Sequence, residues 1–287
     1  MEPLLVVGAG PTGLAAALFL SKAGVRCRVI DKAPEPAVTS RAQVINPRTL
    51  ELLEPTSVTA AVLKEARPIH RVSFYEGWQQ IAELEFGNAH ARFHLSVLPQ
   101  ARTEALLTQA LATHGVQPER AVALEGFSQH NGSVEAVLAK SDGSRETVRT
   151  PIMLGADGAH SVVRETLHLD FKGSSFPEAW PLYDIELDCP LDLESAHVSF
   201  VQSGLVFLLC IRDGLWRLFG NVPELLERLP PGTKTGRISW QSSFHIGHRV
   251  AAQEVVGDVA IAGDAAHIHS PVAERFRKAV VLDFMQL

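Results

Sequence analysis

Three glycines near the start of the chain have the spacing that binding of a dinucleotide phosphate requires. In the stretch "GAGPTG", Gly8, Gly10 and Gly13 follow the pattern GxGxxG. The first glycine of such a turn permits a tight bend, the second lets backbone approach a pyrophosphate, and the third lets a helix pack closely on a strand. Asp31, eighteen residues after Gly13, can accept hydrogen bonds from a ribose. These residues predict dinucleotide binding without choosing among NAD, NADP and FAD.

The segments around the glycines occur in the order that such a site needs. Residues 4–7 are a short apolar run, which is typical of a strand buried on both faces. Residues 14–22 are rich in alanine and leucine and predict a helix that Gly24 ends. A second strand is expected over 28–30, directly before the aspartate. The N-terminus of the helix would then present unpaired N–H groups to the phosphates.

The rest of the chain predicts a second helix and two kinds of sheet. The helix is expected over 100–114. Asn-Gly and Asp-Gly dipeptides are strong hairpin signals, so 122–150 is expected to form an antiparallel meander. Short apolar runs and three tryptophans within 171–250 predict a mainly antiparallel sheet. The predicted fold class is therefore α/β: a Rossmann-like domain interrupted by a mainly antiparallel β-sheet domain for the substrate.

Composition narrows the classes of function. The 287 residues carry a formal net charge of −6 and contain no run of Lys or Arg, which argues against a general nucleic-acid binder. Three isolated cysteines fit a reducing compartment, and no secretory leader is visible, so we expect a cytoplasmic protein. No apolar run reaches ~18 residues, so no membrane span is expected. Oligomeric state stays undetermined.

Several polar residues have both a functional and a purely structural interpretation. His267 and His269 form an HxH pair without a carboxylate or cysteine partner set, so we expect packing rather than metal binding. Asp157 could cap a helix as well as contact a cofactor, and Asp264 could be a turn residue. Arg41 could lie on a solvated face. The aromatic side chains of the predicted sheet, including Phe200, Phe207, Trp216 and Phe219, are expected to pack within it.

Three glycine-containing stretches, taken in order, resemble the FAD-dependent aromatic hydroxylases, the single-component flavoprotein monooxygenases that include p-hydroxybenzoate and phenol hydroxylases. The stretches are "GAGPTG", "GADGAHSVVR" and "GDAAHIHSP". The similarity also takes in "SRAQVINPRTLELLE", "LPQARTEALL" and "FHIGHRVAAQ", so it spans about residues 3 to 271. The resemblance implies an FAD-binding domain and makes FAD the expected cofactor.

The resemblance also implies a set of cofactor contacts. Asp31 would bind the adenosine ribose, Arg41 and Gln100 would reach the cofactor from outside the glycine turn, and Asp264 would hold the ribityl chain. Pro271 would lie near the flavin ring. The full set implied to bind cofactor is Gly8, Gly10, Pro11, Thr12, Gly13, Asp31, Arg41, Gln100, Asp157, Gly158, Asp264 and Pro271. No catalytic side chain and no metal ligand is implied.

The chemistry implied by the resemblance is hydroxylation of a small aromatic, phenolic molecule. NAD(P)H would reduce the flavin, O₂ would form a flavin C4a-hydroperoxide, and its distal oxygen would pass to the ring. The cofactor carries these steps, while the protein supplies positioning and a dry pocket. The implied FAD-binding domain is discontinuous, over 1–69, 100–170 and 257–287, and the substrate domain comprises 70–99 and 171–256.

The last residues depart from the family pattern. In the family a glycine-rich segment follows the "GD" turn and brings a helix N-terminus to the flavin, whereas here residues 273–278 read "AERFRK". Glu274 would place negative charge where reduced flavin also carries it. We therefore expect an altered or truncated C-terminus, with weakened FAD retention and poor or absent hydroxylation relative to a complete family member. Two alternatives stay open: an FAD-dependent oxidoreductase without oxygen insertion, and a truncated, impaired relative that only binds nucleotide.

Overall fold

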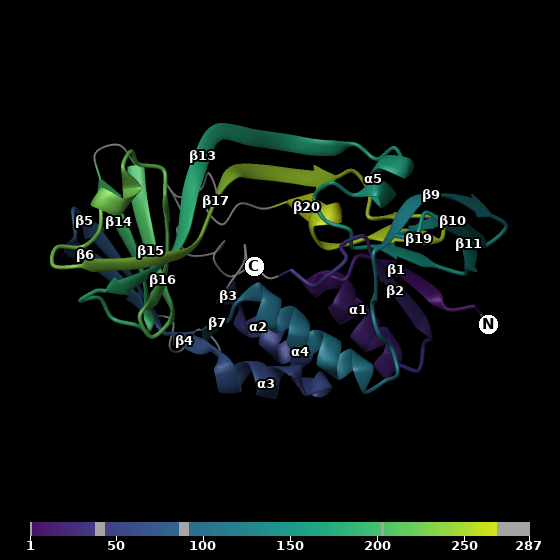
Figure 1. The fold of residues 1–287 in the computed structure, drawn as a ribbon, viewed down its shortest axis with the longest axis horizontal. Coiled ribbons are helices and arrows are strands. Elements are labelled where there is room, and N and C mark those ends of the chain that lie inside the picture. Colours follow the sequence, from purple (N-terminus) through teal and green to yellow (C-terminus); the bar gives the residue numbers. More distant parts are fainter. Residues whose placement is uncertain (1, 38–43, 86–91, 202–203, 269–287) are drawn as a thin grey trace.

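The glycine turn follows the carboxyl end of an inner strand of a six-stranded sheet in the computed structural model, which describes residues 2–37, 44–85, 92–201 and 204–268. The strands are β1 (Leu4–Val7), β2 (Cys27–Asp31), β8 (Glu119–Arg120), β12 (Met153–Gly155), β18 (Val255–Val256) and β19 (Val259–Ile261). Their order is β18-β19-β12-β1-β2-β8, with β18 antiparallel and every other pair parallel (Figure 1). The predicted α/β class is confirmed.

Helices cover one side of this sheet, in the lower part of Figure 1. They are α1 (Pro11–Lys22), α2 (Pro47–Leu53), α3 (Val58–Glu65) and α4 (Gln100–Ala112), with a short 3₁₀ turn η1 (Glu54–Thr56). Asn46 caps α2, since its side-chain oxygen accepts from the N–H of Thr49 at 2.8 Å. Leu14, Leu18 and Leu107 are among the residues of the core that packs α1 and α4 against the sheet.

An antiparallel meander continues from this sheet, as the hairpin signals predict. It comprises β9 (Val122–His130), β10 (Ser133–Lys140) and β11 (Arg145–Thr150). Asn131 and Gly132 both have positive φ, as a two-residue hairpin turn requires. The apolar face of the meander joins a second core that includes Leu138, Met153 and Val163. The last of these belongs to the short helix α5 (Val162–Thr166).

An eight-stranded sheet forms the other large layer, at the left of Figure 1. It is built from β5 (Arg71–Glu76), β6 (Gln79–Glu85), β13 (Phe171–Asp188), β14 (Ser195–Val201), β15 (Gly204–Arg212), β16 (Leu215–Gly220), β17 (Lys234–Ala251) and β20 (His267–Ile268), in the order β20-β17-β13-β16-β15-β14-β5-β6. All pairs are antiparallel except β5 with β14. The expectation of a mainly antiparallel sheet is thus correct, and the parallel pair joins β14 to β5, a strand from an earlier part of the chain.

Two long strands connect this sheet with the six-stranded one. β13 and β17 each have 18 residues and pair along their length, and in Figure 1 they run together from the large sheet to the region of α5 and β20. A small sheet of β3 (Val44–Ile45), β7 (Leu95–Val97) and β4 (Arg67–Ile69) lies between the helices and the large sheet. No helix of the described residues is long and apolar enough to cross a bilayer.

Candidate dinucleotide-binding site

The three glycines of the turn have different surroundings. Gly8 has φ +106°, and a Cβ there would lie 2.2 Å from the carbonyl oxygen of Ala156. A Cβ on Gly13 would lie 1.9 Å from the carbonyl oxygen of Gly8. A Cβ on Gly10 would meet no described atom within 4 Å. Packing of the chain therefore demands glycine at Gly8 and Gly13, whereas Gly10 borders open space, as the position that approaches a pyrophosphate requires.

The start of α1 offers hydrogen-bond donors beside that space. Gly10 is the N-cap, Pro11 follows at the first helical position, and no side chain caps this end. The first turn of a helix has N–H groups without intrahelical acceptors, and the first turn of α1 contains no acidic residue. Thr12 is exposed at this end. The positive end of the helix is thus available to an anion, as phosphate binding needs.

Asp31, at the end of β2, holds the glycine turn. Its Oδ2 accepts a hydrogen bond from the N–H of Ala9 at 2.7 Å, and its Oδ1 accepts from the N–H of Ala33 at 2.8 Å. Arg120 lies 3.6 Å from the same carboxylate. Each carboxylate oxygen has a further lone pair, so the bonds to backbone leave Asp31 able to accept from a ribose.

The "GADG" loop packs directly on the glycine turn. The N–H of Ala156 donates to the carbonyl of Val7 at 2.7 Å, which continues the strand contact past the end of β12. Asp157 accepts from the hydroxyl of Ser161 at 2.6 Å and from the N–H of Val163 at 3.2 Å. Asp157 therefore supports the start of α5 beside the N-cap residue Ser161, and its role toward a cofactor stays a prediction. Gly158 has φ +85° and borders open space.

The "GD" turn reaches the same place from the far end of the chain. Gly263 and Asp264 begin the 3₁₀ turn η3 (Gly263–Ala265), and the carboxylate residue is exposed. A Cβ on Gly263 would lie 2.5 Å from Oγ1 of Thr12. The N–H of Ala262 donates to the carbonyl of Gly155 at 2.8 Å. The three stretches quoted from the sequence thus meet around the N-terminus of α1.

Arg164 is a residue of this site to which the sequence patterns assign no role. It is 6% exposed, and its guanidinium donates to the carbonyl of Ala265 at 3.0 Å and to that of Ala159 at 2.8 Å. It also lies 3.9 Å above the ring of Phe171, the first residue of β13. Arg164 therefore ties the "GADG" loop, the "GD" turn and the start of a long strand together. The available signal was an arginine three residues after the helix cap Ser161.

Gln100 lies at the start of α4 and is linked to the site indirectly. Its side-chain amide donates to Oε1 of Glu104 at 2.9 Å. Glu104 is 4% exposed, and burial raises the pKa of its carboxyl, while the charge of Arg120 lowers it. The charge of Asp31 acts on the same carboxyl. Two other predicted contacts, Arg41 and Pro271, lie outside the described residues, as does residue 269 of the HxH pair.

The large sheet presents an aromatic cluster (Trp180, Phe207, Phe219 and Phe244) on one of its faces. Phe207 and Phe219 stack with centroids 4.4 Å apart. Val44 and Val97, from the small sheet, pack against the same core. Trp216 is 1% exposed and belongs to the core on the opposite face. Phe207, Trp216 and Phe219 pack within the sheet as expected, whereas Phe200 is 37% exposed, so the expectation is wrong for that ring. Val44 and Val97 each lie three residues from a predicted cofactor contact.

Comparison with known proteins adds a family and several relatives. Residues 2–205 and 222–274 match the sequence model of a family described as "FAD binding domain". The chain is 34% identical over 290 residues to 6-methylpretetramide 4-monooxygenase of Streptomyces rimosus, covering 94% of this chain and 52% of that protein. It is 29% identical over 292 residues to pentachlorophenol 4-monooxygenase of Sphingobium chlorophenolicum, covering 93% and 54%. The chain thus spans about half the length of these curated relatives.

Solved structures share the fold. The crystal structure of p-nitrophenol 4-monooxygenase PnpA from Pseudomonas putida DLL-E4 superposes with a TM-score of 0.86 at 24% identity, covering 94% of this chain and 74% of that one. A ternary complex of aklavinone-11 hydroxylase with FAD and aklavinone gives a TM-score of 0.82 at 24% identity, covering 96% and 59%. At 24% identity, the similarity to these two structures establishes a shared fold and nothing further.

Proposed function

The chain belongs to the family of FAD-dependent aromatic monooxygenases, and from that premise we propose that it binds FAD and hydroxylates a small phenolic molecule at the expense of NAD(P)H and O₂. The observation that carries the proposal is the open space at Gly10, bordered by the uncapped N-terminus of α1. The unpaired N–H groups at that helix end would donate to the oxygens of a diphosphate, and the positive end of the helix would favour its charge. The relatives' names supply the reaction type and the aromatic class of substrate.

We assign different parts of the cofactor to different residues of the site. In this proposal the N–H groups that follow Gly10 receive the diphosphate, and Asp31 accepts from the adenosine ribose. Asp264, exposed on the turn that contacts Thr12, faces the ribityl chain. The proposed set also includes Gly8, Pro11, Thr12, Gly13, Arg41, Gln100, Asp157, Gly158 and Pro271. When bound, FAD supplies the redox chemistry, accepting electrons from NAD(P)H and activating O₂.

The proposed place of the substrate follows from the packing of the small sheet. Val44 and Val97 lie close in sequence to Arg41 and Gln100, and both pack against the core that holds the aromatic cluster. We therefore assign that side of the large sheet to the substrate, where apolar walls would exclude water. The proposed domain division, with 70–99 and 171–256 forming the substrate domain, agrees with this placement. Three free cysteines support the proposal of a reducing cytoplasm.

The test is a reconstitution in three steps. Purified chain is titrated with FAD and the flavin spectrum is followed; NADH or NADPH is then added without oxygen, and reduction is timed. Finally ¹⁸O₂ is admitted with a panel of phenols, and products are analysed by mass spectrometry. We expect saturable FAD binding, faster reduction by one nucleotide, and one ¹⁸O atom in a hydroxylated product. Absence of FAD binding, or NAD(P)H oxidation that yields only hydrogen peroxide with every phenol, would contradict the proposal.

A further inference from the structure

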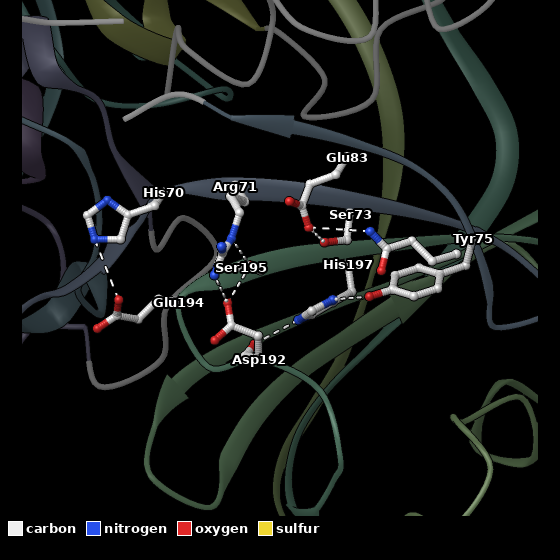
Figure 2. Close-up of polar contacts among 10 residues, drawn as sticks. His70, Arg71, Ser73, Tyr75, Glu83, Asp192, Glu194, Ser195 and His197 are labelled. Atoms are coloured by element: carbon white, nitrogen blue, oxygen red, sulfur yellow. Dashed lines mark hydrogen bonds and ion pairs between the residues drawn. The ribbon is translucent and has the colours of Figure 1, made fainter. Parts of the chain in front are cut away.

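A cavity lies on the large sheet, on the face opposite the aromatic cluster. It measures about 460 Å³ and is lined by residues of β5, β6 and β14, by Trp78 and by the segment 190–192. Figure 2 shows several of its polar side chains. Side chains alternate between faces along a strand, so Ser73 and Tyr75 face this cavity whereas Val72 and Phe74 face the other way. The cavity is therefore separate from the proposed FAD and substrate sites.

The floor of this cavity is polar and buried. Ser73, Tyr75, Ser195 and His197 are exposed by 3%, 7%, 1% and 1%. Ser199, next on the same face of β14, is fully buried, and its hydroxyl has no hydrogen-bond partner in the described residues. Burial of polar groups is costly, and the neighbouring strands β15 and β16 bury apolar side chains on this face. This face of the sheet is thus apolar along β15 and β16 and polar at the cavity.

The hydrogen bonds of His197 define the protonation state of the cavity floor. Its Nε2 lies 2.8 Å from the carbonyl oxygen of Asp192, which can only accept, so Nε2 carries the proton. Burial lowers the pKa of His197, which favours the neutral ring, and Nδ1 then accepts from the hydroxyl of Tyr75 at 3.0 Å. Burial raises the pKa of Tyr75 and keeps that hydroxyl protonated. The floor is neutral, with both imidazole nitrogens engaged.

The rim of the cavity carries an excess of negative charge. Arg71 donates to Oδ2 of Asp192 at 3.2 Å, and the negative charge of Glu83 acts on the same guanidinium. Ser73 and Gln80 donate to Oε2 of Glu83 at 3.2 and 3.3 Å, which leaves Oε1 for a ligand (Figure 2). Two carboxylates against one guanidinium give the lining a net charge of −1 at neutral pH. This charge favours a cationic ligand.

An aromatic wall completes the cavity. The rings of Tyr75 and Trp78 have centroids 5.4 Å apart and are tilted by 50°. Trp78 has φ +70°, a conformation that bulky residues rarely adopt, in the two-residue turn that joins β5 to β6. Its indole N–H donates to the carbonyl of Arg228 at 2.8 Å, which holds the ring at the cavity. Aromatic faces attract ammonium groups, and the attraction is stronger where the site is shielded from water.

We propose that this cavity binds a small organic ammonium ion, with the cation between Glu83 and the rings of Trp78 and Tyr75. The charge of the rim and the aromatic wall select the ammonium group. The neutral floor of Tyr75, His197 and Ser195 adds no charge that would compete with the rim for the cation. A volume of about 460 Å³ is in the range of small-molecule sites. Binding here is independent of FAD and of the hydroxylation reaction.

The test compares cations with neutral molecules of the same shape. The complete chain, with FAD added, is titrated by calorimetry and by ligand-observed NMR with choline against 3,3-dimethylbutan-1-ol, and with benzylamine against benzyl alcohol. We expect at least one cation to bind about tenfold more tightly than its neutral counterpart. Glu83→Gln, an exposed position, is expected to remove most of that difference and leave FAD affinity unchanged. Trp78→Leu should weaken binding of the same cation.

The outcomes separate this inference from the proposed function. Equal binding of each cation and its neutral counterpart would overturn it, as would a preference that survives Glu83→Gln. Glu135→Gln, on the distant meander, serves as the matched control and should leave cation binding unchanged. FAD binding is measured in the same samples, so loss of FAD binding with retained cation selectivity contradicts only the proposed function.

Discussion

At the scale of residues, the three glycines of the GxGxxG motif are needed for different physical reasons. Gly8 and Gly13 are required by contacts within the chain, because any Cβ there would overlap a backbone oxygen. A Cβ on Gly10 would meet nothing within 4 Å in the described residues, so no contact of the chain requires glycine there, and we propose a role toward a ligand. The pattern GxGxxG treats the three positions alike, and only their surroundings distinguish folding from binding.

This difference gives a prediction with a built-in control. Gly13→Ala is expected to lower the free energy of unfolding by roughly 1–3 kcal/mol, since the new Cβ would overpack against backbone. Gly10→Ala is expected to change it by less than about 1 kcal/mol but to weaken FAD binding by about tenfold, which is 1.4 kcal/mol. Denaturant unfolding of the chain without FAD and fluorescence titration with FAD measure the two effects. Unchanged FAD affinity in Gly10→Ala would contradict the assignment of that space to the diphosphate.

At the scale of elements, the strands β13 and β17 depend on one close backbone approach. Gly173 in β13 has φ +152°, and a Cβ there would lie 1.8 Å from the carbonyl oxygen of His248 in β17. Gly247 in β17 is different, because a Cβ there would first meet the rotatable hydroxyl of Ser175 at 3.3 Å. The two glycines of this strand pair therefore differ in whether the surrounding structure has room for a Cβ.

We expect Gly173→Ala to destabilise the chain by roughly 1–3 kcal/mol, because the strand pair must separate or shift locally. Gly247→Ala is the matched control and should stay within about 0.5 kcal/mol of the unmodified chain. Thermal unfolding of both variants, followed by circular dichroism, makes the comparison. Equal stabilities for the two variants would show that the ladder shifts at Gly173 without cost.

At the scale of the whole molecule, a group of charged side chains joins the six-stranded sheet to the meander. Arg28 of β2 donates to Glu119 of β8 and to Glu146 of β11, with its closest contacts at 2.7 and 2.8 Å. Lys140 of β10 lies 2.9 Å from Glu146. Hydrogen bonds from Arg28 and then Lys140 lower the pKa of Glu146 from 4.5 to about 2.

The lowered pKa of Glu146 predicts how stability depends on pH. A carboxylate with a depressed folded-state pKa stabilises the fold above its unfolded value of 4.5, and this contribution is lost as pH falls toward about 2. Because the side chain is partly exposed, its contribution is roughly 1 kcal/mol or less. Glu146→Gln should therefore be less stable than the unmodified chain at pH 7, with the difference shrinking between pH 4.5 and 3. Urea unfolding at several pH values, with Glu135→Gln as control, measures this; a constant difference would contradict it.

Local signals in the sequence determined much of the first domain. Strand β1 is found at Leu4–Val7 as predicted, and α1 ends at Lys22 as predicted but begins at Pro11, three residues before the predicted start. The hairpin at Asn131 and Gly132 is confirmed. These features could be predicted because each depends on neighbouring residues: a backbone conformation, a cap, or an apolar period. The cofactor contacts at Arg41 and Pro271 and the effect of residues 273–278 stay predictions, outside the described residues.

Only the tertiary structure decided which distant residues act together. Nothing local indicates that Arg164 joins the carbonyls of Ala159 and Ala265, or that Thr12 lies against Gly263. The ammonium cavity likewise requires β5 to enter the large sheet beside β14, more than a hundred residues later in the chain. The physical reason is that the sequence determines which side chains are present and what chemistry they can perform. The contacts that orient those side chains come from long-range packing of strands and helices.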